Sequence, residues 1–197
     1  MDRSTDYEVL LAAVDWLEAG SSVYLATVAE TWGSAPRRPG SMMVIHPDGL
    51  FTGSVSGGCV EDELITQVLK GDFEQGLPRI IKYGVTSDLV QRVGLPCGGR
   101  LTLLLERIDS VAELRKLLQA VESGQLVSRH ICLTTGETSL HPCSNITASQ
   151  RNKFHFDGKN LINVFGPRWR MLLIGAGELS QRVAQLALTL DYAVTFC

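Results

Sequence analysis

The sequence predicts an α/β protein, with a mixed α+β domain over residues 1–166 and the first βαβ unit of a truncated Rossmann-like domain over residues 167–197. Short β-rich segments alternate with amphipathic helical segments along most of the chain. The character changes at Gly166-Pro167-Arg168, after which an apolar strand leads directly into Gly175-Ala176-Gly177. A Gly-rich turn between a strand and a helix is typical of dinucleotide-type folds. These observations define the expected fold class and the two expected domains.

The first half of the chain is expected to alternate between helices and short strands. In order, we expect a helix over 6–19, strands over 23–29, 41–46 and 50–55, and a helix over 60–70. Apolar residues that recur on one face indicate the helices, and Gly20 and Gly71 are their expected ends. The second and third strands flank Pro47-Asp48-Gly49, a strong turn signal, so they should pair as a hairpin.

The middle of the chain is expected to continue the same pattern. In order, we expect strands over 79–83 and 101–108, a helix over 110–123, and strands over 126–134 and 154–164, the last with a turn at Asp157-Gly158. Ser110 can cap this helix, Glu113 would complete a capping box, and Gly124 would end it. The polar and weakly patterned span 136–152 is expected to be a loop.

Residues 167–197 are expected to form a βαβ unit, with strands over 171–174 and 193–197 around a helix over 179–190. Such a unit cannot bury both faces of its parallel pair, so we expect the chain to be truncated. Gly175 and Gly177 are its candidate cofactor-binding residues. However, Ser180 takes the third glycine position, and the acidic residue that binds a ribose should follow the second strand. Binding of NAD(P) by this chain alone is therefore not expected.

The composition indicates a globular protein of ordinary charge. The 197-residue chain is 45% hydrophobic and 20% charged, with a net charge of −3. This balance does not favour nucleic-acid binding, and no stretch approaches the roughly 20 apolar residues that span a membrane. The N-terminus lacks the pattern of a signal peptide, so a cytoplasmic location is expected. Five cysteines without scaffold-like spacing fit reduced thiols in a reducing compartment.

Two cysteines each adjoin a Gly-Gly pair. Gly57-Gly58-Cys59 leads into the helix over 60–70, where unpaired N–H groups attract anions and the helix dipole favours a thiolate. Asp62 and Glu63 in the first turn would oppose the thiolate. Cys97-Gly98-Gly99 precedes a strand, and its glycines suggest a tight turn or close ligand approach. The alternative is that both cysteines are only small residues in tight turns. The two elements would support each other as a site if they met in space, which the sequence does not show.

Ser34-Ala35-Pro36-Arg37-Arg38 places two guanidinium groups in a Pro-stiffened loop, which a hairpin joins to the Gly57 turn. Because arginine binds phosphate with two hydrogen bonds, this proximity favours an anion site over a solvated loop. Cys132 lies within a predicted strand and is expected in the core, whereas Cys143 is expected to be an incidental surface thiol. His141 and Cys143 lack a matching second pair of ligands, so no metal site is expected.

Several motifs together resemble a known family. They are Gly33-Ser34-Ala35-Pro36-Arg37, Gly40-Ser41-Met42-Met43, residues 53–61, Tyr83-Gly84-Val85-Thr86 and Gly94-Leu95-Pro96-Cys97-Gly98-Gly99. They look like the motifs of the XdhC/CoxI family, which are accessory proteins of molybdenum hydroxylases such as xanthine dehydrogenase and carbon monoxide dehydrogenase. The family's usual second domain is Rossmann-like and begins with a Gly-Ala-Gly turn, which Gly175-Ala176-Gly177 matches. Glu178 stands where a histidine often follows.

The resemblance implies a maturation chaperone rather than an enzyme with its own turnover. Such a protein binds the molybdenum cofactor (molybdopterin) as cargo, assists its sulfuration with a cysteine desulfurase, and delivers it to a molybdenum hydroxylase apoenzyme. This cofactor is a phosphorylated pterin dithiolene, an anion with a soft metal centre. The resemblance implies that the cofactor-binding residues include Ser34, Arg37, Arg38, Gly57, Gly58, Cys59, Gly98 and Gly99. The N–H groups of the Gly turns, together with Arg37 or Arg38, would hold the phosphate, and Cys59 or Cys97, the candidate catalytic residues, would lie near the metal or the transferred sulfur.

Two other functions remain open from the sequence. One is an enzyme, either a nucleotide-dependent oxidoreductase or a sulfurtransferase that carries a persulfide on Cys59. Tight NAD binding would favour the first, and cyanide-labile sulfur on Cys59 would favour the second. The other function is that of a non-catalytic remnant that only dimerises. Because an uncovered strand pair could add to a second copy of the chain, we expect a homodimer.

Overall fold

The computed structural model describes residues 5–33, 37–58, 60–73, 78–84, 99–143, 154–166, 169–190 and 192–197. The helices are α1 (Thr5–Glu18), α2 (Glu61–Leu69), α4 (Ala112–Glu122) and α5 (Glu178–Thr189). The strands are β1 (Val23–Trp32), β2 (Met42–Ile45), β3 (Phe51–Gly53), β4 (Arg79–Tyr83), β5 (Arg100–Ile108), β6 (Val127–Cys132), β7 (Thr138–Pro142), β8 (His155–Phe156), β9 (Asn160–Phe165), β10 (Trp169–Leu173) and β11 (Tyr192–Phe196). The predicted mixed α/β fold class is confirmed. None of the helices in the described part of the chain has the length and apolar character needed to cross a membrane.

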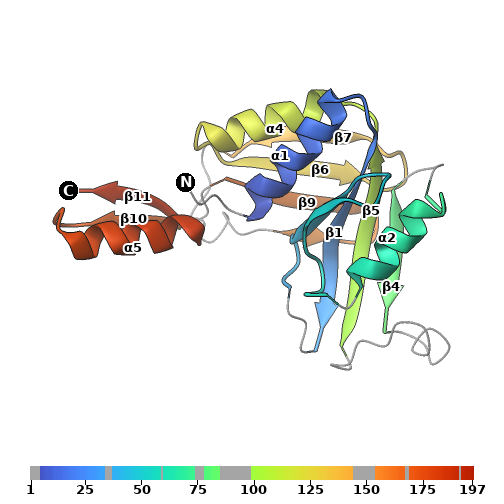
Figure 1. Cartoon of the computed structure of the whole chain (residues 1–197), viewed down its shortest axis with the longest axis horizontal. Coiled ribbons are helices and arrows are strands. Elements are labelled where there is room, and N and C mark those ends of the chain that lie inside the picture. Colours follow the sequence, from blue (N-terminus) through green and yellow to red (C-terminus); the bar gives the residue numbers. More distant parts are fainter. Residues whose placement is uncertain are drawn as a thin grey trace.

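Two antiparallel sheets build the main body (Figure 1). The first has the strand order β3-β2-β1-β5-β4, and the second has the order β7-β6-β9-β8. β1 and β5 pair from Val23↔Ile108 to Trp32↔Arg100, so β1 continues beyond its predicted end at residue 29. β2 and β3 pair with Met43 opposite Gly53, which confirms the predicted hairpin.

The apolar core covers both faces of the first sheet. α1 and α4 lie side by side (Figure 1) and bury their apolar faces against β1 and β2. α2 packs Leu64 and Val68 against the opposite face of that sheet. Between the two sheets, Ala29 and Leu104 meet Ile131 of β6. Because side chains fill both faces in this way, the ends of the strands and their loops are where the fold can hold a ligand.

The C-terminal segment has the predicted βαβ order. β10 pairs in parallel with β11, from Trp169↔Tyr192 to Leu173↔Phe196, and α5 connects them. Figure 1 shows this unit at the left, apart from the two antiparallel sheets. The Rossmann-like assignment and the division into domains at residues 166 and 167 stay predictions.

A strand lies within the span that was expected to be a loop. β7 pairs antiparallel with β6, from Val127↔Pro142 to Ile131↔Thr138. β7 is an edge strand with a largely exposed surface, so its residues do not need the apolar alternation that marks a half-buried strand. The prediction of a loop was therefore wrong for residues 138–142, where backbone pairing rather than hydrophobic pattern defines the strand.

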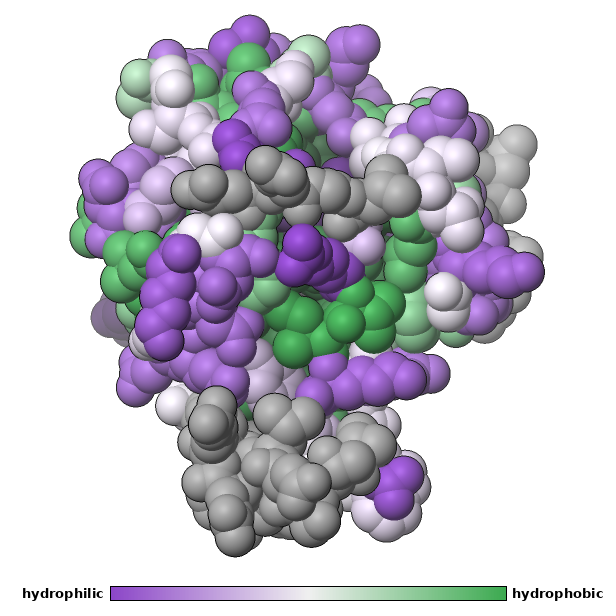
Figure 2. Space-filling view, turned by 90° about the vertical axis from the view of Figure 1, so that its right-hand side faces the viewer, coloured by the Kyte–Doolittle hydropathy of each residue, from purple (hydrophilic) through white to green (hydrophobic). Residues whose placement is uncertain are grey.

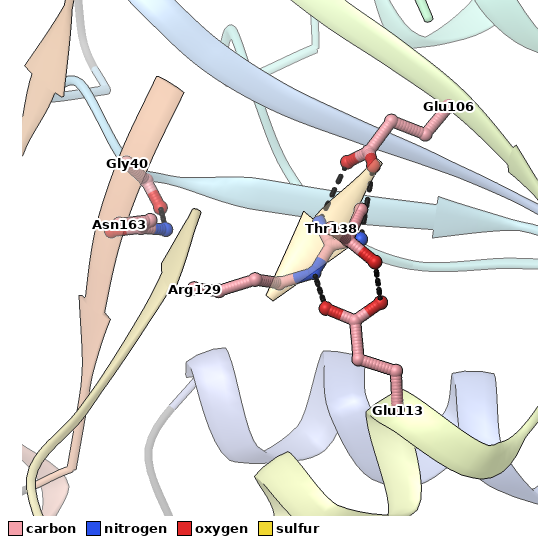
Figure 3. A network of polar contacts seen from close by, with 6 residues as sticks. All are labelled: Gly40, Glu106, Glu113, Arg129, Thr138 and Asn163. Atoms are coloured by element: carbon pink, nitrogen blue, oxygen red, sulfur yellow. Dashed lines mark hydrogen bonds and ion pairs between the residues drawn. The ribbon is translucent and has the colours of Figure 1, made fainter. Parts of the chain in front are cut away.

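Glu113 does not form the predicted capping box. Val111 is the N-cap of α4 and makes no side-chain cap, but Ser110 Oγ accepts a hydrogen bond from the N–H of Ala112 at 3.4 Å, as predicted for a capping serine. Glu113 instead accepts hydrogen bonds from Arg129 Nε at 2.9 Å and from Thr138 Oγ1 at 2.5 Å (Figure 3). The buried Arg129 requires carboxylate partners, and Glu113 is one of them. Tertiary contact thus overrides a local pattern.

Candidate functional site

Three of the sequence motifs meet at one end of the first sheet. The register places Trp32 opposite Arg100, and Tyr83 opposite Leu101, so the end of β1, the end of β4 and the start of β5 are neighbours. A Cβ atom added to Gly33 would lie 3.4 Å from Gly99 Cα, and one added to Gly84 would lie 2.4 Å from Gly99 O. The motifs that contain these glycines, far apart in the sequence, therefore converge. We take this end of the sheet as the candidate site.

Gly84→Ala is expected to destabilise the protein by about 2–3 kcal/mol, because the new Cβ would collide with the carbonyl of Gly99 and the φ angle of +79° is unfavourable for alanine. Gly124→Ala is the matched control, since its φ angle is +69° but no atom lies within 4 Å of the added Cβ. The control should cost only about 1 kcal/mol. Urea unfolding of both variants makes the comparison, and equal losses would contradict the close approach of Gly84 and Gly99.

A buried carboxylate organises the turn before α2. Glu61 is the first residue of α2, and its side chain turns back into the preceding loop. Its oxygens accept hydrogen bonds at 2.9–3.2 Å from the backbone N–H groups of Val55, Ser56, Gly57, Gly58 and Val60. They also accept hydrogen bonds from the hydroxyls of Ser54, at 2.8 Å, and Ser56. Burial opposes the charge, but these hydrogen bonds outweigh it and hold the pKa of Glu61 well below its usual range.

The N–H groups of this turn, which were predicted to bind an external anion, thus bind a carboxylate of the same chain. The N–H groups of Gly57 and Gly58, which the sequence analysis assigned to an external phosphate, donate to Glu61. Sequence reasoning missed this role because it treated the acidic residues of the first helical turn only as opponents of a thiolate. The available signal was an acidic residue at the start of a helix that follows Gly-Gly, where a carboxylate can reach back to free N–H groups.

Arg37 lies against the same turn, as the sequence analysis expected for this loop. Its Nε donates a hydrogen bond to Ser54 Oγ at 3.3 Å, and Ser54 in turn donates to Glu61. The side chain of Arg38 is exposed. The loop is held from the other side by Asn163, whose Nδ2 donates to the carbonyl oxygen of Gly40 at 3.1 Å (Figure 3). One guanidinium group is therefore fixed beside the turn and a second one is open to solvent.

The remaining predicted site residues fall into two groups. Ser34, Cys59, Cys97 and Gly98 lie outside the described residues. Gly99 is buried where β5 begins. Gly175 and Gly177 are exposed between β10 and α5, in the unit that Figure 1 shows apart from the first sheet. Arg37, Gly57 and Gly58 thus gather at the Glu61 turn, Gly99 lies at the end of the first sheet with Gly33 and Gly84, and the roles of all these residues in a site stay predictions.

Tyr83 is a site residue to which sequence reasoning assigned no role. It is buried at the end of β4, and within the described residues its hydroxyl has no hydrogen-bond partner. The same holds for Glu63 Oε2. Burial raises the pKa of Tyr83, and the charges of Glu63 and Glu61 raise it further, so the phenol stays protonated and can donate. Its position in the Tyr83-Gly84 motif was the available signal.

Cys132 is not in the core. It is half-exposed near the end of β6, and its thiol lies 3.1 Å from Thr134 Oγ1. The strand pattern failed here because Cys132 is the last residue of β6, opposite Asn160 of β9. Hydrogen bonds from Thr134 and Thr135 lower the pKa of Cys132 to about 7. Among the described residues, no group of three or more side chains could hold a metal ion.

We expect Cys132 to be alkylated by iodoacetamide with a rate that rises to half its maximum near pH 7, because its pKa is about 7 and only the thiolate reacts. Thr134→Val should move this midpoint to higher pH, since it removes the hydrogen bond that contributes most to the lowering. Peptide mass spectrometry reads each cysteine separately, with Cys143 as the reference in the same sample. An unchanged midpoint in Thr134→Val would contradict this account.

Much of the described site lies within a segment that matches one protein family. Residues 16–84 match the model of the XdhC and CoxI family. This segment contains Arg37, the Glu61 turn and Tyr83, so the match covers most of the described site. Residues 16–84 of this chain are thus similar to the XdhC and CoxI family, which is the family that the motifs of the sequence resemble.

Two curated relatives and one solved structure resemble the chain. The molybdenum cofactor insertion chaperone PaoD of Escherichia coli (strain K12) is 32% identical over 93% of this chain and 55% of its own length. A protein of Bacillus subtilis (strain 168), named as a probable xanthine dehydrogenase subunit, is 30% identical over 90% of this chain and 60% of its own length. A crystal structure described as a xanthine dehydrogenase from Bacillus halodurans shares the fold, with a TM-score of 0.66 and 24% identity over 93% of this chain and 61% of the other. The chain therefore spans between about half and two thirds of each of these relatives.

Proposed function

We propose that this protein is an accessory chaperone that binds molybdenum cofactor and assists its sulfuration and insertion into a xanthine dehydrogenase-type molybdenum hydroxylase. The observation that carries this proposal is the convergence of the motif glycines Gly33, Gly84 and Gly99 at one end of the first sheet. The similarity to PaoD, which is named as a molybdenum cofactor insertion chaperone, supports it. The protein would act by binding and transfer, without catalytic turnover of its own.

The charges of the site suit a phosphorylated cargo. Arg37 is fixed beside the Glu61 turn, and Arg38 is exposed in the same loop, so the pair offers a phosphate two guanidinium groups. The N–H groups of Gly57 and Gly58 would have to leave Glu61 to take part. We therefore assign phosphate binding to Arg37 and Arg38. The Glu61 turn would instead position Cys59, which follows Gly58.

The thiols supply the other half of the proposed chemistry. Cys59 follows Gly58 directly, and Cys97 lies two positions before Gly99. A thiolate is a suitable ligand for a soft metal centre and a suitable carrier of sulfur. In this proposal Cys59 and Cys97 face the metal or the sulfur that is transferred, while the arginines hold the opposite, anionic end of the cargo.

The proposal includes the partners that such a chaperone needs. They are a molybdenum hydroxylase apoenzyme that receives the cargo and a cysteine desulfurase that supplies sulfur, in the cytoplasm. We also propose a homodimer. The apolar side chains of Leu172, Ile174 and Leu179 in the βαβ unit are largely exposed in the single chain, and association could cover them.

Cofactor retention tests the proposal directly. The purified chain, incubated with molybdenum cofactor and passed through ultrafiltration, should retain stoichiometric molybdenum by metal analysis. Cys59→Ser and the double variant Arg37→Gln/Arg38→Gln should each lose most of it, whereas the control Cys143→Ser should retain it. Failure of the wild-type chain to bind the cofactor would refute the proposal. Full cofactor binding and full target activation by both Cys59→Ser and Cys97→Ser would refute its thiol part.

A further inference from the structure

A groove with a volume of about 610 Å³ lies beside the candidate site. It is bounded by the end of β1, the start of β5, the end of β4, and β8 of the second sheet. Its lining includes Trp32, Lys82, Arg100, Thr102, Phe154 and Phe156. Figure 2 shows the side of the molecule that carries the edge strand β4. On this side, an apolar hollow in the surface lies between hydrophilic side chains. The volume falls in the range of small-molecule sites.

The groove presents an aromatic face to solvent. The side chain of Trp32 is 65% exposed, although it sits on a central strand of the first sheet. The guanidinium carbon of Arg100 lies 5.1 Å from the centroid of the Trp32 ring, so a cation already covers part of the indole system. Exposed aromatic rings beside cations are the arrangement that stacks flat, anionic heteroaromatic ligands.

The cations of the groove come from neighbouring strands. Lys82 of β4 pairs with Thr102 of β5, which lies two positions from Arg100, so strand alternation directs these three side chains to the same face. Within the described residues, no carboxylate forms an ion pair with Lys82 or Arg100. The lining also includes Glu30, which the two cations outnumber.

The floor of the groove continues the apolar core between the two sheets. Ile80 lies two positions before Lys82, on the same face of β4, and packs into that core with Phe154 and Phe156. The two phenylalanines therefore belong both to the core and to the lining of the groove. A floor anchored in this way is rigid, whereas Trp32 and Arg100 form the open side and directly adjoin Gly33 and Gly99 of the candidate site.

We propose that this groove binds the pterin end of the cargo, as a planar heteroaromatic ring stacked on Trp32, with Arg100 and Lys82 donating hydrogen bonds to the acceptor atoms on the edge of the ring. This inference rests on the proposed function for the identity of the ring system. It extends that function by assigning cargo recognition to residues that no sequence motif singled out.

A metal-free probe tests the groove. The probe is 6-carboxypterin, a fluorescent pterin with a negative charge, whose binding to the full chain is followed by fluorescence anisotropy. Trp32→Ala should weaken binding roughly 5- to 150-fold, which is the range expected for the loss of one stacked base. Trp32→Phe keeps an aromatic face and should retain most of the affinity. Arg100→Gln should weaken binding and reduce its dependence on salt, and inorganic phosphate should compete with the probe.

Arg107→Gln is the matched control, because Arg107 lies at the opposite end of β5, where it pairs with Asp109. It should bind the probe as the wild type does, and circular dichroism should show that all variants are folded. The proposal would be overturned if the wild type did not bind 6-carboxypterin. It would also be overturned if Trp32→Ala and Arg100→Gln both bound the probe with the affinity of the wild type. A nucleoside monophosphate that binds through Trp32 and Arg100 while the pterin does not would also overturn it.

The same variants separate this inference from the proposed function. If Trp32→Ala and Arg100→Gln retain molybdenum cofactor as the wild type does, the groove assignment is wrong and the chaperone proposal stands. If the wild type binds 6-carboxypterin through Trp32 and Arg100 but never retains molybdenum, the groove is a pterin site and the chaperone proposal fails.

Discussion

Arg129→Ala is expected to lower the free energy of unfolding by about 3–5 kcal/mol, one of the two largest effects that we predict for a single substitution. The guanidinium group of Arg129 is 4% exposed and donates to Glu106 through two nitrogens, at 2.8 and 2.9 Å (Figure 3). Glu106 is equally buried, so removal of the arginine leaves a carboxylate without its partner in an apolar surrounding. Burial acts against the charge of Arg129, but the two glutamates raise its pKa, so it stays protonated.

Urea unfolding at neutral pH measures the loss, and two further variants locate its origin. Glu113→Gln should cost much less, because Glu113 is partly exposed and takes only one nitrogen of Arg129. The double variant Arg129→Met/Glu106→Leu should be more stable than Arg129→Ala, since it removes both buried charges together. If the double variant were less stable than Arg129→Ala, the unpaired charge of Glu106 would not be the cause.

Glu61→Gln is expected to lower the free energy of unfolding by about 3–5 kcal/mol, because the substitution leaves several buried donors of the turn without an acceptor. A glutamine has one acceptor oxygen where the glutamate has two, and its amide group would face the N–H groups of Gly58 and Val60. Because the turn precedes Cys59, the variant should also reduce retention of molybdenum cofactor. Asp62→Asn is the matched control in the same helical turn, with an exposed side chain, and should change stability by no more than about 0.5 kcal/mol.

The stabilisation by Glu61 should depend on pH in a defined direction. The folded-state pKa of Glu61 lies below its ordinary value of 4.5. Above that value the carboxylate is ionised in both the folded and the unfolded states, so its contribution is complete. As the pH falls below 4.5, the unfolded state takes up a proton first and the contribution declines. The difference in stability between the wild type and Glu61→Gln should therefore shrink between pH 5 and pH 3, and a constant difference would contradict this mechanism.

Local signals predicted most elements where propensity and packing agree. The helix before Gly20, the hairpin around Pro47-Asp48-Gly49 and the βαβ order after Gly166 follow from turn chemistry and apolar periodicity, and the structure contains all three. The signals failed where a partner distant in the sequence determines whether a strand forms or which group a side chain contacts. β7 exists through its pairing with β6, and Glu113 serves Arg129 instead of its own helix end.

The candidate site shows the same division. The Arg37-Arg38 loop and the Gly57-Gly58 turn were predicted as neighbours, and the contact of Arg37 with Ser54 places them together. The acceptor of the glycine N–H groups could not be assigned from sequence, because Glu61 and Asp62 are both acidic residues of the same turn and only the fold directs Glu61 inward. Trp32 and Arg100 carry no motif signal, since their proximity arises from the register of β1 and β5.

The fold class, most helices and strands, the resemblance to the XdhC and CoxI family and the glycine-rich segments of the site could all be predicted from the amino-acid sequence, because turn residues and apolar periodicity act over a few positions. The three-dimensional arrangement was needed to see that Gly33, Gly84 and Gly99 converge, that Glu61 accepts hydrogen bonds from the glycine turn, and that an exposed tryptophan lies beside two cations. These contacts arise because strand register and burial bring together residues that are distant in the sequence. Local composition does not encode which distant partner a strand or a buried charge will meet.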